Sequence, residues 1–278
     1  MKNIFQYDLH THTSFSDGRN DLLTMLQSAE SYGMAGMVFT DHAFSDVEAE
    51  RLWTNYHSNH LPASKVKILF GTETTVADLS GKPVVSADIL RKFDLVLMDC
   101  NGILFRQLAE LKAPENIASV FCNTLINACS IPEITILAHP LNCGLPPLNL
   151  SLERFTNEML GNLADAFVRH GKVFEIMNQM YYWHTTTSFE QFHSEYSRIV
   201  QIMKEAGVRF SLGSDSHSCC GIGNFSWAHR IVEEQRIWKK IPIRSDIDMS
   251  KSAKTNKKWR LTDENSISKI ISVDRERG

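Results

Sequence analysis

Two histidines separated by a single residue lie near the N-terminus and could chelate a metal ion. They belong to the segment Asp8-Leu9-His10-Thr11-His12, at the end of a predicted strand. Because side chains two residues apart on a strand point the same way, His10 and His12 would share one face. Two imidazoles on one face can bind Zn²⁺, Mn²⁺ or Fe²⁺. The same pattern also occurs as an ordinary polar strand end, so further residues must decide.

Other histidines and carboxylates follow later predicted strands at the same relative place. They are Asp17 after the first strand, His42 after the second, Glu73 after the third, His139 after the fifth, and Asp215 and His217 after the seventh. Each of them alone has a simpler interpretation, since an aspartate can start a turn and a histidine can pack in a core. Their recurrence at the ends of five strands indicates one shared site.

The elements that would position these residues are short apolar runs separated by segments with helical spacing. We predict strands over residues 4–9, 36–40, 66–71, 93–98, 133–138, 172–177 and 208–213. We predict helices over residues 21–32, 152–170, 188–206 and 225–237, and Gly33, Gly171 and Gly207 lie where helices end.

This alternation of strands and helices is typical of a parallel α/β protein, either a doubly wound sheet or a closed barrel. A barrel gathers the C-terminal ends of all its strands around one mouth, whereas an open sheet spreads them along an edge. Because the candidate residues follow nearly every strand, we expect a TIM-like barrel of seven strands.

Composition limits the class of protein. The chain has 278 residues, of which 43% are apolar and 22% charged, and this favours a folded domain over disorder. No apolar run reaches the length of about 18 residues that spans a membrane, and the N-terminus turns polar too early for a signal peptide. Six scattered cysteines do not suggest a disulfide framework, so we expect a cytoplasmic protein.

Charge is distributed unevenly along the chain. Residues 239–278 carry 11 Lys/Arg and 6 Asp/Glu, whereas residues 1–238 carry 18 and 26. The net negative charge of residues 1–238 favours the binding of cations and disfavours the binding of a nucleic-acid backbone. We therefore expect a catalytic domain over residues 1–240 and a basic, partly disordered tail over residues 241–278.

The ordered motifs DLHTHT-x3-DG, TDH, GTE, AHP and GSDSH resemble those of the PHP (polymerase and histidinol phosphatase) family of metal-dependent phosphoesterases. The resemblance runs from residue 8 to about residue 223. It implies a distorted (β/α)7 barrel with two or three divalent metals (Zn, Mn or Fe) at its mouth.

The resemblance also implies which residues would bind these metals. One ion would be held by His10, His12, Glu73 and Asp215; a second by Glu73 and His139; a third by Asp17, His42 and His217. Glu73 would serve catalysis by bridging two ions, and Asp17 or His42 by protonating the leaving group. Asp8 and Asp41 are the nearest candidates to orient the imidazoles.

One position departs from the family pattern. After the fourth predicted strand, relatives commonly have a histidine that completes the second metal site, and here the residue is Asn101. Asn101 could ligate through its carbonyl oxygen, Asp99 could substitute from the same strand face, and Cys100 is a softer ligand on the opposite face. The second ion would then be weakly bound or absent.

A few further residues could line the mouth and contact substrate. They are Arg19, Glu175, Asn178 and His184. Arginine suits phosphate because its guanidinium binds two oxygens at once. A solvated arginine and an ordinary surface histidine are the simpler interpretations of Arg19 and His184.

These features indicate a metal-dependent phosphoric ester hydrolase acting on the phosphomonoester of a small metabolite, with a histidinol-phosphate-like compound as one option. A metal-bridging hydroxide would be the nucleophile, because two cations about 3.5–4 Å apart lower the pKa of water and screen the phosphate. A nuclease or nucleotide phosphatase is an alternative, supported by the basic tail. A metal-binding module with impaired catalysis is another, supported by the missing histidine.

Overall fold

The computed structural model describes residues 4–100, 103–111 and 114–237. The predictions for Asn101, for the domain boundary at residue 240 and for a tail over residues 241–278 lie outside these described residues. No helix in the described part of the chain is long and apolar enough to cross a membrane.

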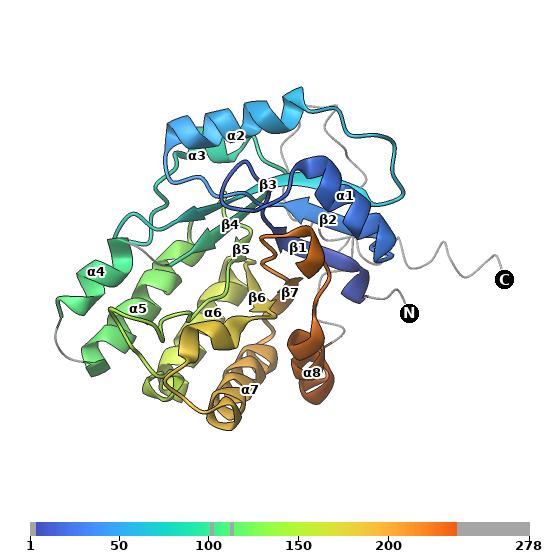
Figure 1. The fold of residues 1–278 in the computed structure, drawn as a ribbon. Coiled ribbons are helices and arrows are strands. Elements are labelled where there is room, and N and C mark those ends of the chain that lie inside the picture. Colours follow the sequence, from blue (N-terminus) through green and yellow to red (C-terminus); the bar gives the residue numbers. More distant parts are fainter. Residues whose placement is uncertain (1–3, 101–102, 112–113, 238–278) are drawn as a thin grey trace, which may run out of the picture.

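Seven parallel strands form the centre of the molecule and pair in sequence order (Figure 1). They are β1 (Tyr7–Thr11), β2 (Gly36–Phe39), β3 (Lys67–Thr75), β4 (Leu95–Asp99), β5 (Ile136–Leu137), β6 (Val173–Met177) and β7 (Arg209–Gly213). The first and last strands meet at their C-terminal ends, where the His12 N–H donates to Ser216 O at 2.9 Å and the Asp215 N–H to His10 O at 3.0 Å. The sheet therefore nearly closes, which confirms the predicted distorted seven-stranded barrel.

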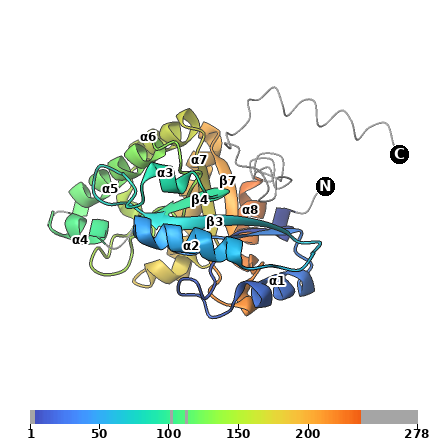
Figure 2. The ribbon, with the colours of Figure 1, turned by 90° about the horizontal axis from the view of Figure 1, so that it is seen from above.

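Helices cover the outside of this barrel. They are α1 (Leu22–Ser31), α2 (Asp46–Ser58), α3 (Ala87–Leu90), α4 (Ile103–Ala109), α5 (Pro114–Cys129), α6 (Asn157–Arg169), α7 (Phe189–Ala206) and α8 (Ser226–Gln235). Helices α5, α6 and α7 lie next to one another along one side, with α1 and α2 on the other side (Figures 1 and 2). The predicted helix start at Asp21 is confirmed, because its carboxylate caps α1 by accepting from the Thr24 N–H at 2.8 Å.

Four predicted boundaries were wrong for local reasons. The first strand covers Tyr7–Thr11 rather than residues 4–9, because Ile4–Gln6 forms a short 3₁₀ helix. The fifth strand is shorter than predicted, because a turn closed by the Ile134 N–H and Ile131 O precedes it. The helix predicted over residues 152–170 is split, since Thr156 caps a new helix by accepting from the Met159 N–H. Strand β3 is longer than predicted because its pairing with β4 continues to Thr75, so Glu73 lies within the strand.

The inside of the barrel changes from apolar to charged toward the mouth. Its apolar part consists of Leu9, Val38, Leu69, Leu95, Leu97, Ile136, Ala138 and Val173. Three of these strands continue with a carboxylate on the same inward face. Glu73 lies two residues after Gly71, Asp99 two residues after Leu97, and Glu175 two residues after Val173. The period of a strand thus aims three buried carboxylates at the mouth.

Candidate metal centre at the barrel mouth

Four side-chain atoms at the mouth have the spacing of ligands around one metal ion. They are His10 Nε2, His12 Nε2, Glu73 Oε2 and Asp215 Oδ1, which we call the four-atom cluster. His10 Nε2 lies 3.0 Å from His12 Nε2 and from Glu73 Oε2, and 3.4 Å from Asp215 Oδ1. His12 Nε2 lies 3.4 Å from Glu73 Oε2 and 3.1 Å from Asp215 Oδ1. His10, His12 and Glu73 form a group of possible metal ligands whose atoms all lie within 4.8 Å of one another, and Asp215 Oδ1 lies beside the two imidazoles. Ligand atoms around a zinc ion with bonds of about 2.0–2.1 Å are roughly 3.3–3.4 Å apart.

The four-atom cluster concentrates charge where water is scarce, since His10, His12 and Glu73 are fully buried. Burial disfavours the charged form of His12, but hydrogen bonds to Asp215 and Glu73 outweigh it and raise the pKa of His12 to about 9. Burial also opposes the Glu73 carboxylate, yet the charges of His10 and His42 hold its pKa well below the ordinary value. The positive charge of the protonated imidazoles thus balances the negative charge of the carboxylates. A divalent cation bound at the same place would displace these protons.

Glu73 also reaches a second set of donors. Its other oxygen, Oε1, lies 3.1 Å from Nε2 of His139, which follows β5. Asp99 ends β4 close by, where burial and the charge of Glu73 raise its pKa to about 6. Cys100, in contrast, is buried in the apolar layer outside the barrel. The donor atoms suited to a second cation are therefore oxygens and one imidazole nitrogen.

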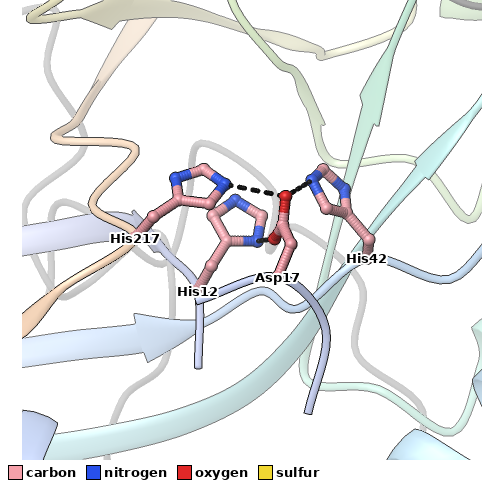
Figure 3. Close-up of side chains that lie close together, drawn as sticks. All are labelled: His12, Asp17, His42 and His217. Carbon is pink, nitrogen blue, oxygen red and sulfur yellow. Dashed lines mark hydrogen bonds and ion pairs between the residues drawn. The ribbon is translucent and has the colours of Figure 1, made fainter. Parts of the chain in front are cut away.

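A third set of donors is more open to solvent (Figure 3). Asp17 Oδ2 lies 3.2 Å from Nε2 of His217 and 3.6 Å from Nε2 of His42. His12 joins this set through its second ring nitrogen, because Nδ1 lies 3.9 Å from Asp17 Oδ1. Burial opposes the Asp17 carboxylate, but His217 and His42 outweigh it and hold its pKa far below the ordinary value. The sequence predicted Asp17, His42 and His217 together but did not predict that His12 joins them.

Glu175 contacts the ring of His10 and the backbone of His139, and with these two histidines it forms a further group of possible metal ligands. Its Oε1 lies 2.9 Å from His10 Nδ1, and its Oε2 accepts from the His139 N–H at 2.7 Å. Asn142 performs a similar role for the His139 ring, with its Nδ2 at 3.1 Å from Nδ1. A partner on one ring nitrogen sets the tautomer and leaves the other nitrogen for a metal.

The prediction that Asp8 and Asp41 orient the imidazoles was wrong. Asp8 accepts from the N–H groups of Ser214 and Gly223, at 3.0 and 2.9 Å. Asp41 accepts from the Thr13 N–H and the Tyr56 hydroxyl, both at 2.7 Å. Both carboxylates are buried beside loops that need hydrogen-bond acceptors, so they hold those loops in place rather than the imidazole rings.

Two of the candidate ligands have unusual backbone conformations. His139 has a φ of 28° and Asp215 a φ of 53°, in the left-handed region that residues with a Cβ rarely adopt. Strain of this kind persists where the surrounding contacts demand it and gathers at functional sites. Both residues make such contacts, His139 with Glu73 and Asp215 with His10 and His12.

The comparisons with known proteins agree with this geometry. The family model described as the PHP domain matches residues 8–237. The chain belongs to the PHP family. It is 26% identical over 258 residues to a protein of Thermoanaerobacter sp. (strain X514) named "Probable phosphatase", with 91% of this chain and 96% of the relative covered. It is 29% identical over 236 residues to a protein of the same name from Acetivibrio thermocellus, with 83% and 87% covered.

Among solved structures, the PHP barrel resembles histidinol phosphate phosphatase from Lactococcus lactis, with a TM-score of 0.59 and 18% identity. The match covers 82% of this chain and 93% of that chain, whose crystals hold zinc, L-histidinol and phosphate. At this identity the likeness establishes the shared fold.

In the PHP barrel, the residues predicted to contact substrate lie in different environments. Arg19 is exposed beside the third donor set, and its N–H donates to His217 O at 2.8 Å. Asn178 instead starts helix α8, because its Oδ1 accepts from the N–H of Trp227 at 2.8 Å. Glu175, as described above, has both oxygens engaged by His10 and His139.

The interpretation of His184 as a surface residue was wrong. It is 1% exposed, with Nε2 at 3.1 Å from Leu141 O, and its ring stacks on Phe192. A side chain at Gly144 would collide with His184 Nδ1, so this glycine allows the two loops to pack together. The neighbouring Trp183 stacks on His139 with ring centroids 4.9 Å apart, a contact that the aromatic run Tyr181-Tyr182-Trp183 did not reveal.

Proposed function

We propose that this PHP protein is a metal-dependent phosphoesterase that hydrolyses the phosphomonoester of a small metabolite. The observation that carries the proposal is the four-atom cluster, in which five of the six separations are 3.0–3.4 Å, close to the spacing of ligand atoms around one metal ion. The names of the curated relatives and the phosphate held by the Lactococcus lactis structure support the same chemistry.

Three ions can be assigned to the donors, each of them Zn²⁺, Mn²⁺ or Fe²⁺. His10, His12, Glu73 and Asp215 would hold the first; Glu73, His139 and Asp99 the second; Asp17, His42 and His217 the third. The mixture of nitrogen and oxygen donors without thiolate suits all three metals. Such ions lower the pKa of water and neutralise the charge of a phosphoryl group.

The protein's own residues would handle the proton for the leaving alcohol. Asp17 remains a carboxylate, because His217 and His42 hold its pKa far below the ordinary value. It is therefore a poor acid but a good partner for a charged imidazole. His42 Nε2 lies 3.6 Å from Asp17 Oδ2 with 19% of its side chain exposed, so His42 would be the better placed proton donor whenever this nitrogen does not bind the third ion.

The substrate would be a small phosphomonoester, and a histidinol-phosphate-like compound is one option because L-histidinol and phosphate occupy the Lactococcus lactis structure. The test is metal analysis of the purified protein together with a panel of phosphomonoesters assayed with added Mn²⁺ or Zn²⁺. We expect hydrolysis that is abolished by a chelator and by His10→Ala. His229→Gln, which changes an exposed histidine on α8, should leave both metal content and activity unchanged.

Two outcomes would contradict the proposal. Full metal content without turnover of any phosphate ester would favour a metal-binding module. Cleavage of oligonucleotides in preference to monoesters, with binding that weakens steeply as salt rises, would favour a nuclease.

A further inference from the structure

A cavity of about 220 Å³ opens directly beside the third donor set. Its walls include His42 and Asp17 of the third donor set, Glu48 and Arg51 of α2, and the apolar side chains of Phe15, Phe44 and Leu52. The volume is below the range of about 300–1,000 Å³ that holds drug-sized ligands. The cavity therefore suits one part of a metabolite rather than a large molecule.

The position of the cavity relates it to the leaving group. His42 and Asp17, two donors of the third set, are themselves part of the wall, so a ligand in the cavity lies next to the proposed phosphate site. The Phe44 ring stacks on His42 with centroids 5.0 Å apart, yet Phe44 remains 48% exposed. An apolar part of a ligand that covers this ring would gain free energy by removing it from water.

Among the charged residues of the wall, Arg51 indicates the kind of ligand. Arg51 forms no ion pair within the described ranges of the chain. The nearby Glu48 is engaged instead with the backbone, since its Oε2 accepts from the Phe44 N–H at 2.7 Å. A guanidinium without a carboxylate partner offers a planar pair of donors to an incoming anion.

We propose that this cavity binds the alcohol part of the substrate and that Arg51 recognises a second anionic group on it, a carboxylate or a second phosphate. The inference rests on the proposed phosphoesterase function and deepens it. The favoured substrates are then phosphomonoesters with two separated negative groups and a flat or apolar segment between them.

The test compares 4-carboxyphenyl phosphate with 4-carbamoylphenyl phosphate, which has nearly the same shape but no second charge. The 3-substituted isomers cover a shorter span, and phenylene bisphosphates test a second phosphate in place of the carboxylate. We expect kcat/KM to be about 10-fold higher for the acid than for the amide, mainly through KM, as one charge-assisted hydrogen bond would give. A preference for either anion over the amide supports the proposal.

Variants test whether Arg51 itself causes the preference for the acid over the amide. Arg51→Met should remove the preference for the acid over the amide while leaving the metal content unchanged, and Arg51→Lys should restore part of the preference. Arg169→Met is the matched control, because Arg169 is exposed at the C-terminal end of α6, at the opposite end of the barrel. A preference that persists in Arg51→Met, or a wild-type protein that favours the amide, would overturn the proposal.

Calorimetric titration of the same compounds distinguishes this inference from the proposed function. If none of the esters is hydrolysed, the phosphoesterase proposal fails. Tighter binding of the acid that is lost in Arg51→Met would then still support the anion site, and equal binding of acid and amide would refute it.

Discussion

At the scale of single residues, the mouth shows how one carboxylate can hold two histidines, one by its ring and the other by its backbone. Glu175 has no free oxygen, because Oε1 faces His10 Nδ1 at 2.9 Å and Oε2 accepts from the His139 N–H at 2.7 Å. It therefore turns His10 Nε2 toward the four-atom cluster and holds the strained backbone of His139. Neither contact requires Glu175 itself to touch a metal or a substrate.

Glu175→Gln tests this role. The amide can keep its oxygen toward His10, but its NH₂ group cannot accept from the His139 N–H, so one of the two hydrogen bonds is lost. We expect the affinity for Mn²⁺ or Zn²⁺ to fall about 10–100-fold, as for other residues behind metal ligands. Calorimetric titration of the metal-stripped protein measures the change. Glu195→Gln on α7 is the control, and equal metal affinity in both variants would contradict the assigned role.

At the scale of elements, the site depends on how closely β7 approaches β1 and β6. A Cβ placed on Gly213 at the end of β7 would lie 2.1 Å from Glu175 Oε1 and 2.7 Å from His10 Cβ. The absence of a side chain there lets the carboxylate of Glu175 reach His10 across the barrel. Gly161 of α6 differs, since a Cβ there would meet nothing within 4 Å.

We expect Gly213→Ala to lower the free energy of unfolding by about 1–3 kcal/mol, through the overlap with Glu175. The same variant should bind metal more weakly, because Glu175 would have to move. Gly161→Ala should instead stabilise the protein by roughly 0.5–1 kcal/mol, since alanine is the better helix former. Urea unfolding of both variants measures the difference. A Gly213→Ala protein as stable and as tightly metal-binding as the wild type would show that the strands can separate freely.

At the scale of the whole molecule, loops from distant parts of the chain close over the mouth and bury a titratable group. His184 is 1% exposed between the loop after β5 and helix α7, and burial lowers its pKa to about 4. The ordinary pKa is about 6.5, so the unfolded chain takes up a proton before the folded protein does. Stability from this group is therefore present above pH 6.5 and lost as the pH falls toward 4.

The loss should reach about 3 kcal/mol, since one pKa unit corresponds to about 1.4 kcal/mol. His184→Gln removes the titration and keeps a donor for Leu141 O, so its free energy of unfolding should fall less between pH 6.5 and 4. Urea unfolding in the presence of a chelator measures both proteins without a contribution from bound metal. His229→Gln, at an exposed position, should follow the wild type. If the free energy of unfolding of His184→Gln falls as much as that of the wild type between pH 6.5 and 4, the buried histidine does not cause this loss of stability.

The sequence by itself determined the order of the seven strands, the parallel barrel and the recurrence of candidate ligands toward the C-terminal ends of the strands, but not that Glu73 lies inside a longer β3. These are properties of local periodicity and chain order: apolar runs mark the strands, and period two puts His10 with His12 on one face. Only the tertiary structure decided which side chains meet. His12 contacts two donor sets, Glu175 reaches His10 across 165 residues of chain, and Arg51 lines the same cavity as His42. Such contacts depend on the curvature and closure of the barrel, which bring distant residues within a few ångströms and leave no mark in local spacing.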